Sequence, residues 1–234
     1  MSIRATDAIL SALRVVDTPT VCNAIEEVLG SRQGAGYCRS PVVCADPSLP
    51  PIVGYARTAK ICGGEPSKLS KAAQRDLRLA YYRYAATLPG PNVVVLEDTD
   101  PSPGIGAFWG EVNTAIHKGL GVVGCLTNGS FRDLGMLASG FQIVGGSIMP
   151  SHAFVHITEI DVPVSVFGLG VRPGDLIHAD RHGAVVIGAD VVDRIAYGID
   201  LTMRKEAPIL RAARAPGFDL EALIRAWGDA DDIH

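Results

Sequence analysis

The chain has 234 residues, of which 47% are hydrophobic and 20% charged, with a formal net charge of -4 and a pI near 5.8. This length and composition predict a globular protein with a full apolar core. The slightly negative charge argues against a basic surface for nucleic acid phosphates, so no nucleic acid partner is expected. The sequence contains neither a signal-peptide pattern nor an apolar run long enough to cross a bilayer, and we expect a cytoplasmic protein with no membrane partner.

The N-terminal third is predicted to open with helices. One helix is expected from Ala5 to Leu13, and Thr18 and Pro19 supply an N-cap and a first-turn proline for a second helix that ends at Gly30. After these come a long loop over residues 31–50, a strand from Ile52 to Cys62 and a helix from Ser67 to Ala86.

From Asn92 the pattern changes to buried strands that alternate with short helices. The apolar run Val93–Leu96 predicts a strand covered on both faces. A strand is also expected from Val122 to Leu126, and a short helix from about Arg132 to Ala138. Between these strands we predict a helix from about Trp109 to Lys118, whose inward stripe would be Val112, Ala115, Ile116 and Leu120.

The rest of the chain is predicted to be β-rich and then helical. Residues 141–187 are expected to be mainly strand, followed by a helix from about Ala189 to Arg214 and a shorter one from Asp219 to Trp227, with Asp219 as its N-cap. We therefore predict a single domain over residues 1–234. It would have a helical N-terminal region at about 1–30, a core at about 50–187 and C-terminal helices at about 189–228.

Two segments that follow buried strands contain candidate chemistry. The first, Gly104–Val112, has glycines near a helix start, where backbone N–H groups bind carboxylates or phosphates, and it places Glu111 in the first helical turn. The second, Thr127–Asp133, is a tight turn that ends in an adjacent Arg-Asp pair. Such a pair offers a forked cation for an anion and a hard oxygen ligand for a divalent metal. From residue types alone the structural interpretations are favoured: Glu111 would simply stabilise a helix start, and Arg132-Asp133 would be a surface turn whose Asp caps the next helix.

Other polar patterns are weaker alternatives. His178, Asp180 and His182 alternate along a predicted strand and could share one face as a metal site, although a solvated strand face is favoured. His152 and His156 have the spacing of a helical zinc pair but fall in a predicted strand. The glycines at 104, 106 and 110 resemble a dinucleotide-binding loop only loosely.

The five cysteines are odd in number and form no CxxC pair, which is typical of free thiols in a reducing compartment. Cys125 lies within an apolar strand and is expected to be a buried structural thiol rather than a nucleophile.

An ordered series of short motifs spans roughly residues 18 to 187. It includes Gly110-Glu111, Gly119-x-Gly121-Val122-Val123-Gly124, Asn128-Gly129-x-x-Arg132-Asp133, Val162-Pro163-Val164, Val171-x-Pro173-Gly174-Asp175 and Ala179-Asp180-x-x-Gly183-Ala184-Val185-Val186. In this series the chain resembles the RraA-like / 4-hydroxy-4-methyl-2-oxoglutarate aldolase family. The resemblance implies an α/β fold, an α/β/β sandwich like the swivelling phosphohistidine domain, with added N- and C-terminal helices. It also implies homotrimers or homohexamers with active sites at subunit boundaries.

For the enzyme branch, the resemblance implies a class II pyruvate aldolase that cleaves a 4-hydroxy-2-oxo acid and also decarboxylates oxaloacetate. Asp133 would bind Mg or Mn, and Arg132 would contact the pyruvyl group and stabilise enolate charge. Glu111, which stands 21 positions before Arg132, would move a proton through water. The substrate would bind at Gly110, and the backbone amides near Val112 and Asn113 would receive its carboxylate.

The sequence departs from the family pattern at two places, and the family offers a rival function. Asn128 stands where many relatives have Asp, and Arg181-His182 stands where an acidic pair is more usual, so the substrate could differ. Glu206 is only a candidate for the acid that a neighbouring subunit contributes. The rival is a non-catalytic RraA-type regulator that binds and inhibits ribonuclease E. The N- and C-terminal helical material of this chain favours the enzyme.

Overall fold

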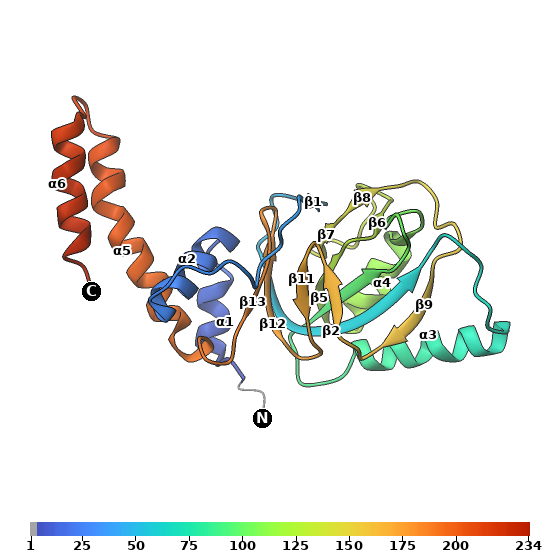
Figure 1. Cartoon of the computed structure of the whole chain (residues 1–234). Coiled ribbons are helices and arrows are strands. Elements are labelled where there is room, and N and C mark those ends of the chain that lie inside the picture. Colours follow the sequence, from blue (N-terminus) through green and yellow to red (C-terminus); the bar gives the residue numbers. More distant parts are fainter. Residues whose placement is uncertain (1–3) are drawn as a thin grey trace.

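The computed structural model describes residues 4–234 and is built around a curled sheet of eight strands (Figure 1). The middle of the sheet, from β2 to β7, is parallel, and its outer strands are antiparallel. In spatial order the strands are β1 (Val43–Cys44), β7 (Gln142–Gly145), β5 (Val122–Thr127), β3 (Asn92–Asp98), β2 (Ile52–Cys62), β12 (Leu176–Asp180) and β13 (Gly183–Ile187), and β9 (His156–Ile160) also pairs with β2.

Two smaller β-structures accompany the main sheet. A parallel three-stranded sheet contains β4 (Ala107–Trp109), β6 (Ser130–Phe131) and β8 (Ser147–Ile148), and a hairpin contains β10 (Val164–Val166) and β11 (Leu169–Val171). The hairpin packs its apolar residues on one face of the main sheet, in a core with Val93, Val95 and Ile177. These layers confirm the predicted α/β sandwich.

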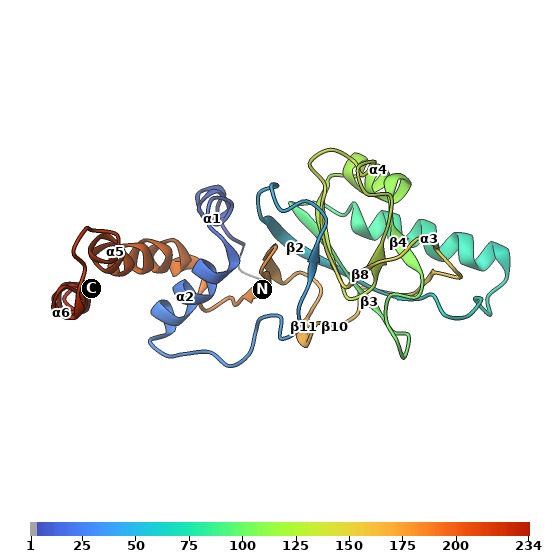
Figure 2. The same ribbon diagram turned by 90° about the horizontal axis from the view of Figure 1, so that it is seen from above.

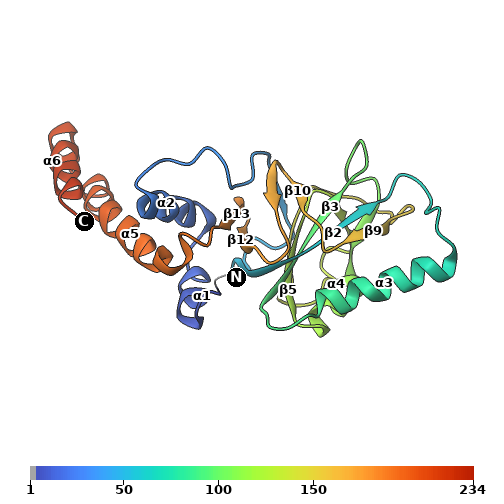
Figure 3. The ribbon, with the colours of Figure 1, turned by 60° about the horizontal axis from the view of Figure 1, so that its bottom comes forward.

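Helices cover the sheet at two places. Helices α3 (Lys71–Ala85) and α4 (Glu111–Gly119) lie beside strands β3 and β5 (Figure 3). Helices α1 (Asp7–Leu13), α2 (Thr18–Leu29) and α5 (Ile195–Ala213), with the 3-10 turn η1 (Val192–Arg194), gather at the end formed by β12 and β13. Helix α6 (Leu220–Asp231) folds back along α5, and this pair extends away from the sheet (Figures 1 and 2). None of the helices in the described part of the chain is long and apolar enough to span a membrane.

The helix boundaries follow their capping residues, with one correction. Gly30 ends α2 in the left-handed conformation at φ 67°, as predicted, but the N-cap of α2 is Asp17 rather than Thr18. The reason is that Thr18 has other partners: its N–H donates to Asp180 at 2.8 Å and its hydroxyl lies 3.0 Å from His178 Nδ1. Residues 1–3 of the predicted N-terminal helical region lie outside the described residues.

The predicted inward face of α4 is wrong. Trp109 belongs to β4, so the helix begins at Glu111, and its buried residues are Thr114 and His117. Val112 is 70% exposed, and Ile116 and Leu120 are also exposed. Polar side chains face inward because each has a buried partner, whereas the apolar stripe faces away from the sheet.

The predicted short helix from Arg132 to Ala138 is also wrong. After β6 the chain forms turns, because Asp133 has φ 58° and Gly135 has φ 83°, and neither value is compatible with a right-handed helix. The N–H of Met136 donates to the carbonyl of Asp133 at 2.9 Å, which closes a tight turn at this point.

Candidate functional site

Strand pairing brings the two candidate segments together. In the small sheet, β4 runs parallel to β6, with Trp109 opposite Phe131. The N–H of Arg132 continues this pairing by donating to the carbonyl of Trp109 at 2.9 Å. Because both strands end at the same edge, the Arg132-Asp133 pair lies beside the first residues of α4. The spatial contact of these segments is therefore a consequence of the small sheet.

Asp133 caps helix α4 from outside the helix. Its Oδ2 accepts a hydrogen bond from the N–H of Glu111 at 3.1 Å, and Gly110, the N-cap residue, makes no side-chain cap of its own. A Cβ atom at position 110 would collide with the Asp133 carboxylate. Glycine is required here for close approach, since its φ of -171° is ordinary extended backbone.

Arg132 lies against the same carboxylate but remains partly open to solvent. Its Nε is 3.6 Å from Asp133 Oδ2, and Nη1 is 3.5 Å from the carbonyl of Pro150. The side chains of Arg132 and Asp133 are 35% and 34% exposed, so both keep surface free for a ligand. An arginine beside a carboxylate at a helix N-terminus can bind an anion and a cation at adjacent positions.

The first turn of α4 presents backbone N–H groups at this place. The N–H of Glu111 donates to the Asp133 carboxylate. The N–H groups of Val112 and Asn113 come before the first hydrogen bond within the helix, in which the N–H of Thr114 donates to the carbonyl of Gly110. The Asn113 side chain is structural, because its amide donates to the carbonyl of Phe108 at 2.5 Å and its oxygen accepts from the Tyr82 hydroxyl. The Glu111 side chain is exposed.

Beneath this turn lies a buried contact that the sequence reasoning missed. His117 Nε2 is 2.7 Å from the Tyr81 hydroxyl, and its Nδ1 is 2.6 Å from the carbonyl of Asn113. These partners assign the proton to Nδ1, with Nε2 accepting from the hydroxyl. Burial lowers the pKa of His117 to about 4, so the imidazole is neutral at pH 7. The signal was the spacing of Asn113, Thr114 and His117, which places them on one helical face.

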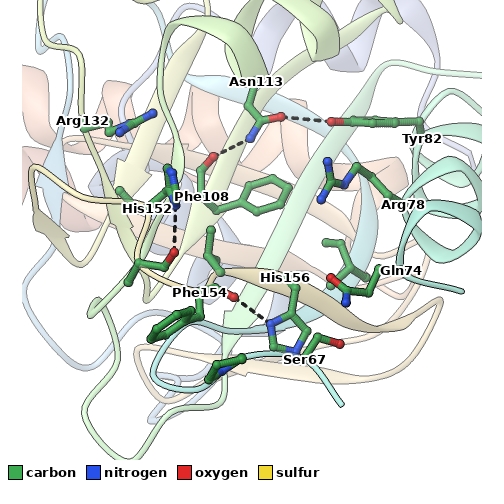
Figure 4. A pocket seen from close by; sticks show the side chains of 15 residues that line it. Ser67, Gln74, Arg78, Tyr82, Phe108, Asn113, Arg132, His152, Phe154 and His156 are labelled. Atoms are coloured by element: carbon green, nitrogen blue, oxygen red, sulfur yellow. Dashed lines mark hydrogen bonds between the residues drawn. The ribbon is translucent and has the colours of Figure 1, made fainter. Parts of the chain in front are cut away.

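A pocket of about 490 Å³ adjoins Arg132 and Asn113 (Figure 4). Arg132 is one of its lining residues, whereas Glu111 and Asp133 are not. Arg78 of α3 faces the pocket from the side opposite Arg132, a position that the sequence reasoning did not single out (Figure 4). The lining also includes His152 and His156, of which only His156 lies in a strand.

The Asn128 departure has a structural explanation. Its side-chain oxygen accepts from the N–H of Asp98 at 2.8 Å, and its amide donates to the Asp98 carbonyl at 3.0 Å. Aspartate could not donate the second bond. Asp98 in turn accepts from the N–H of Gly104 at 2.7 Å, and burial raises the pKa of its carboxyl. Asn128 thus holds the loop that leads to β4 instead of facing a ligand.

The alternative histidine site does not form. His178 is fully buried, which corrects the expected solvated strand face, and its Nδ1 and Nε2 lie within 3.0 Å of Thr18 Oγ1 and the Leu13 carbonyl. Asp180 accepts from the N–H groups of Thr18 and His182. Within residues 4–234, no group of three or more His, Cys, Asp or Glu side chains could hold a metal. All five cysteines are free, and Cys125 is buried, as expected.

Asp133 alone nevertheless fits one type of metal site. Magnesium and manganese prefer oxygen ligands, and magnesium usually keeps several waters while one or two carboxylates and the substrate supply the rest. A partly exposed carboxylate with one oxygen held by a backbone N–H meets that requirement. Glu206, the other candidate acid, is exposed on α5, at the opposite end of the molecule from α4 (Figure 1).

The fold is an α/β sandwich whose candidate site gathers an arginine, an aspartate and a helix N-terminus where two parallel strands end. The chain belongs to the RraA-like family described as Aldolase/RraA, whose model matches residues 18–186. This family includes both aldolases and RNase E inhibitors.

The relatives have both kinds of name. The chain is 31% identical over 180 residues to a Halalkalibacterium halodurans protein named putative 4-hydroxy-4-methyl-2-oxoglutarate aldolase, covering 76% of this chain and 72% of that one. An uncharacterized protein from Pseudomonas syringae pv. tomato shares the fold with a TM-score of 0.72 and 19% identity, over 96% of both chains. Streptomyces coelicolor RraAS2, an unusual member of the RNase ES inhibitor RraA family, matches with a TM-score of 0.66 and 24% identity, over 91% of this chain and 99% of that one.

Proposed function

We propose that this protein is a divalent-metal-dependent lyase that cleaves a 4-hydroxy-2-oxo acid, such as 4-hydroxy-4-methyl-2-oxoglutarate, to pyruvate, and that also decarboxylates oxaloacetate. The observation that carries the proposal is the contact of Arg132 and Asp133 with the N-terminus of α4. The aldolase name of the Halalkalibacterium relative supports the same reaction class.

In this proposal the substrate carboxylate binds the N–H groups of Val112 and Asn113, where the helix dipole favours negative charge. Asp133 would hold the Mg or Mn ion. When bound, the metal supplies a fixed positive charge beside the 2-oxo group. The Arg132 guanidinium would bind the oxygen of the 2-oxo group.

The reaction then breaks the bond between C3 and C4. The proton of the 4-hydroxyl leaves through water to the exposed Glu111 carboxylate, C4 becomes a carbonyl, and the electron pair moves to the pyruvate enolate. Arg132 stabilises the enolate charge because its own charge is already in place. A proton returned to C3 gives pyruvate. Oxaloacetate has no 4-hydroxyl proton to lose: its C4 carboxylate leaves as carbon dioxide, and the electron pair of the C3–C4 bond forms the same pyruvate enolate.

We also propose that the protein assembles as a homotrimer or homohexamer in which a neighbouring subunit completes each site. Another copy of the chain would cover the apolar outer face of α4. This face starts beside the site at Val112 and continues through Ile116 to the C-cap residue Leu120, all of which are exposed. Because Glu206 lies far from α4 of its own chain, any contact of its carboxylate with the site would be made to another subunit.

The test is pyruvate release from 4-hydroxy-4-methyl-2-oxoglutarate and from oxaloacetate, measured with a coupled dehydrogenase. We expect activity that excess chelator abolishes and that Mg or Mn restores. Asp133→Asn should lower kcat at least about 100-fold, since several kcal/mol of charge stabilisation are lost. Asp161→Asn is the matched control, because Asp161 has the same left-handed backbone, at φ 57°, but lies outside the site.

Two outcomes would reject the proposal. Full activity of Asp133→Asn, or in excess chelator, would rule out the metal role. Inactivity toward every 2-oxo acid, combined with tight inhibition of ribonuclease E, would replace the lyase with the regulator that the family also contains.

A further inference from the structure

The pocket beside Arg132 has an unusual charge distribution. Among the described residues that line it there are two arginines and two histidines but no aspartate or glutamate. A concave surface whose charged side chains are two arginines focuses a positive potential and favours anionic ligands. Its volume of about 490 Å³ exceeds what a pyruvyl group requires and leaves room for a substrate that extends beyond Arg132.

Arg78 is the cation best placed to meet that extension. It lies on α3 and, within residues 4–234, forms no ion pair with an acidic side chain. Figure 4 shows Arg78 and Arg132 on opposite sides of the pocket, with Phe108 between them. One turn further along α3, Tyr82 donates to Asn113 at 3.0 Å, which ties the Arg78 helix to the first turn of α4.

The two histidines are oriented by the loop that closes the pocket. His152 Nδ1 lies 2.8 Å from the carbonyl of Ala153, and His156 Nδ1 lies 2.8 Å from the carbonyl of Phe154. Because a carbonyl oxygen can only accept, Nδ1 of each ring carries a proton and donates it, which leaves Nε2 as the second polar atom of the ring. Polar side chains therefore surround the pocket on the Arg78 side as well as the Arg132 side.

We propose that this pocket receives a second carboxylate of the substrate and that Arg78 is its ion-pair partner. This inference rests on the proposed lyase function, in which Arg132 and the N-terminus of α4 hold the pyruvyl end. Arg78 then makes the enzyme selective for 2-oxo dicarboxylates over 2-oxo acids that end in a methyl group. It acts as a specificity-determining residue and takes no part in bond cleavage.

The first experiment compares Arg78→Met with the wild-type protein on two substrates, 4-hydroxy-2-oxoglutarate and 4-hydroxy-2-oxopentanoate. The second substrate has a methyl group where the first has its distal carboxylate. We expect kcat/KM for the dicarboxylate to fall about 10- to 100-fold, as for the loss of a charged hydrogen bond, mainly through KM. The value for the monocarboxylate should stay within about twofold, the change expected when no charged contact is lost. Arg75→Met, on the same helix but outside the pocket lining, should leave both values unchanged.

The second experiment measures binding without turnover, by calorimetry in Mg²⁺, with 2-oxoglutarate and 2-oxopentanoate as unreactive probes. Wild-type protein should bind the dicarboxylate about 10- to 100-fold more tightly, and Arg78→Met should abolish that difference. Equal affinity of the wild-type protein for both probes, or an equal loss of both in Arg78→Met, would overturn the inference. A binding preference without any cleavage would instead refute the lyase and leave the carboxylate pocket standing.

Discussion

At the scale of single residues, the site depends on close contact between positions that are distant in sequence. Asp133 supplies the N-terminal cap that Gly110 does not supply, and its left-handed backbone turns the carboxylate toward α4. The sequence identified Gly110, Glu111, Arg132 and Asp133 through their motif. The physical reason for the glycine appears only in three dimensions, because the Asp133 carboxylate occupies the place of a side chain at position 110.

Gly110→Ala tests this close contact. The added Cβ would displace the Asp133 carboxylate from Glu111, so the proposed lyase activity should fall at least tenfold while the helical content stays unchanged. Overpacking of this kind costs about 1–3 kcal/mol of stability. The measurements are pyruvate release and the free energy of unfolding.

Gly119→Ala is the control for that variant. Position 119 lies at the other end of α4, and a Cβ there would meet no atom within 4 Å. Its activity should match the wild type, and its stability should be equal or higher by up to about 1 kcal/mol. If both alanine variants retained full activity, the exclusion of a side chain at Gly110 would have no functional role.

At the scale of elements, the sequence predicted the long strands and helices well because their apolar periods are clear. Strand β2 has the predicted limits, and Asp219 caps α6 as expected. The prediction failed where polar groups decide the packing. Apolar spacing predicts Val112, Ile116 and Leu120 for the inward face of α4, yet Thr114 and His117 face inward because each finds buried partners.

Arg132 begins a turn instead of a helix for a different reason, the backbone conformation of the residues that follow it. The turn depends on positive φ angles at Asp133 and Gly135, and residue types alone do not specify when an aspartate adopts such a conformation. Arg78 was missed as well, because nothing in the sequence brings α3 to the site. That approach is set by tertiary contacts such as the hydrogen bond from Tyr82 to Asn113.

The contact between His117 and Tyr81 should make the stability of the protein depend on pH. Burial lowers the pKa of His117 to about 4 from 6.5, so below pH 6.5 the unfolded chain binds a proton that the folded protein does not. The stability present above pH 6.5 is therefore lost as the pH falls toward 4. Between pH 7.5 and pH 5 this residue should lower the free energy of unfolding by about 2 kcal/mol.

His117→Gln removes this titration while keeping a polar side chain near Tyr81. Chemical denaturation of both proteins at pH 7.5 and pH 5 measures the difference. The variant should lose about 2 kcal/mol less than the wild type over this interval. An equal loss in both proteins would mean that His117 keeps its ordinary pKa in the folded state.

At the scale of the whole molecule, two regions expose apolar side chains beyond the ordinary scatter. One is the outer face of α4. The other is the α5–α6 pair, which extends from the sheet (Figure 1) and exposes Met203, Ile224 and Trp227. The motif resemblance led us to expect an oligomer, and these faces are where we would place its contacts.

Ile116→Glu tests the outer face of α4. Its side chain is 37% exposed, so a charge there should be tolerated in a single chain but not within a subunit contact. Sedimentation should show a trimer or hexamer for the wild type and smaller species for the variant, with reduced lyase activity. Leu79→Glu on α3, at 40% exposure, is the control and should leave the assembly intact. An unchanged assembly of Ile116→Glu would place the contact elsewhere.

The left-handed conformation of Asp133 also limits how this position can change during evolution. At φ 58° the backbone accepts asparagine at least as readily as aspartate, whereas β-branched or bulky residues are strongly disfavoured. Asparagine keeps an oxygen to cap α4 but loses the negative charge. A single nucleotide substitution could thus abolish the proposed lyase activity and leave the fold intact. Such a change would be a simple way for an aldolase to lose its activity in a family that contains both aldolases and RNase E inhibitors.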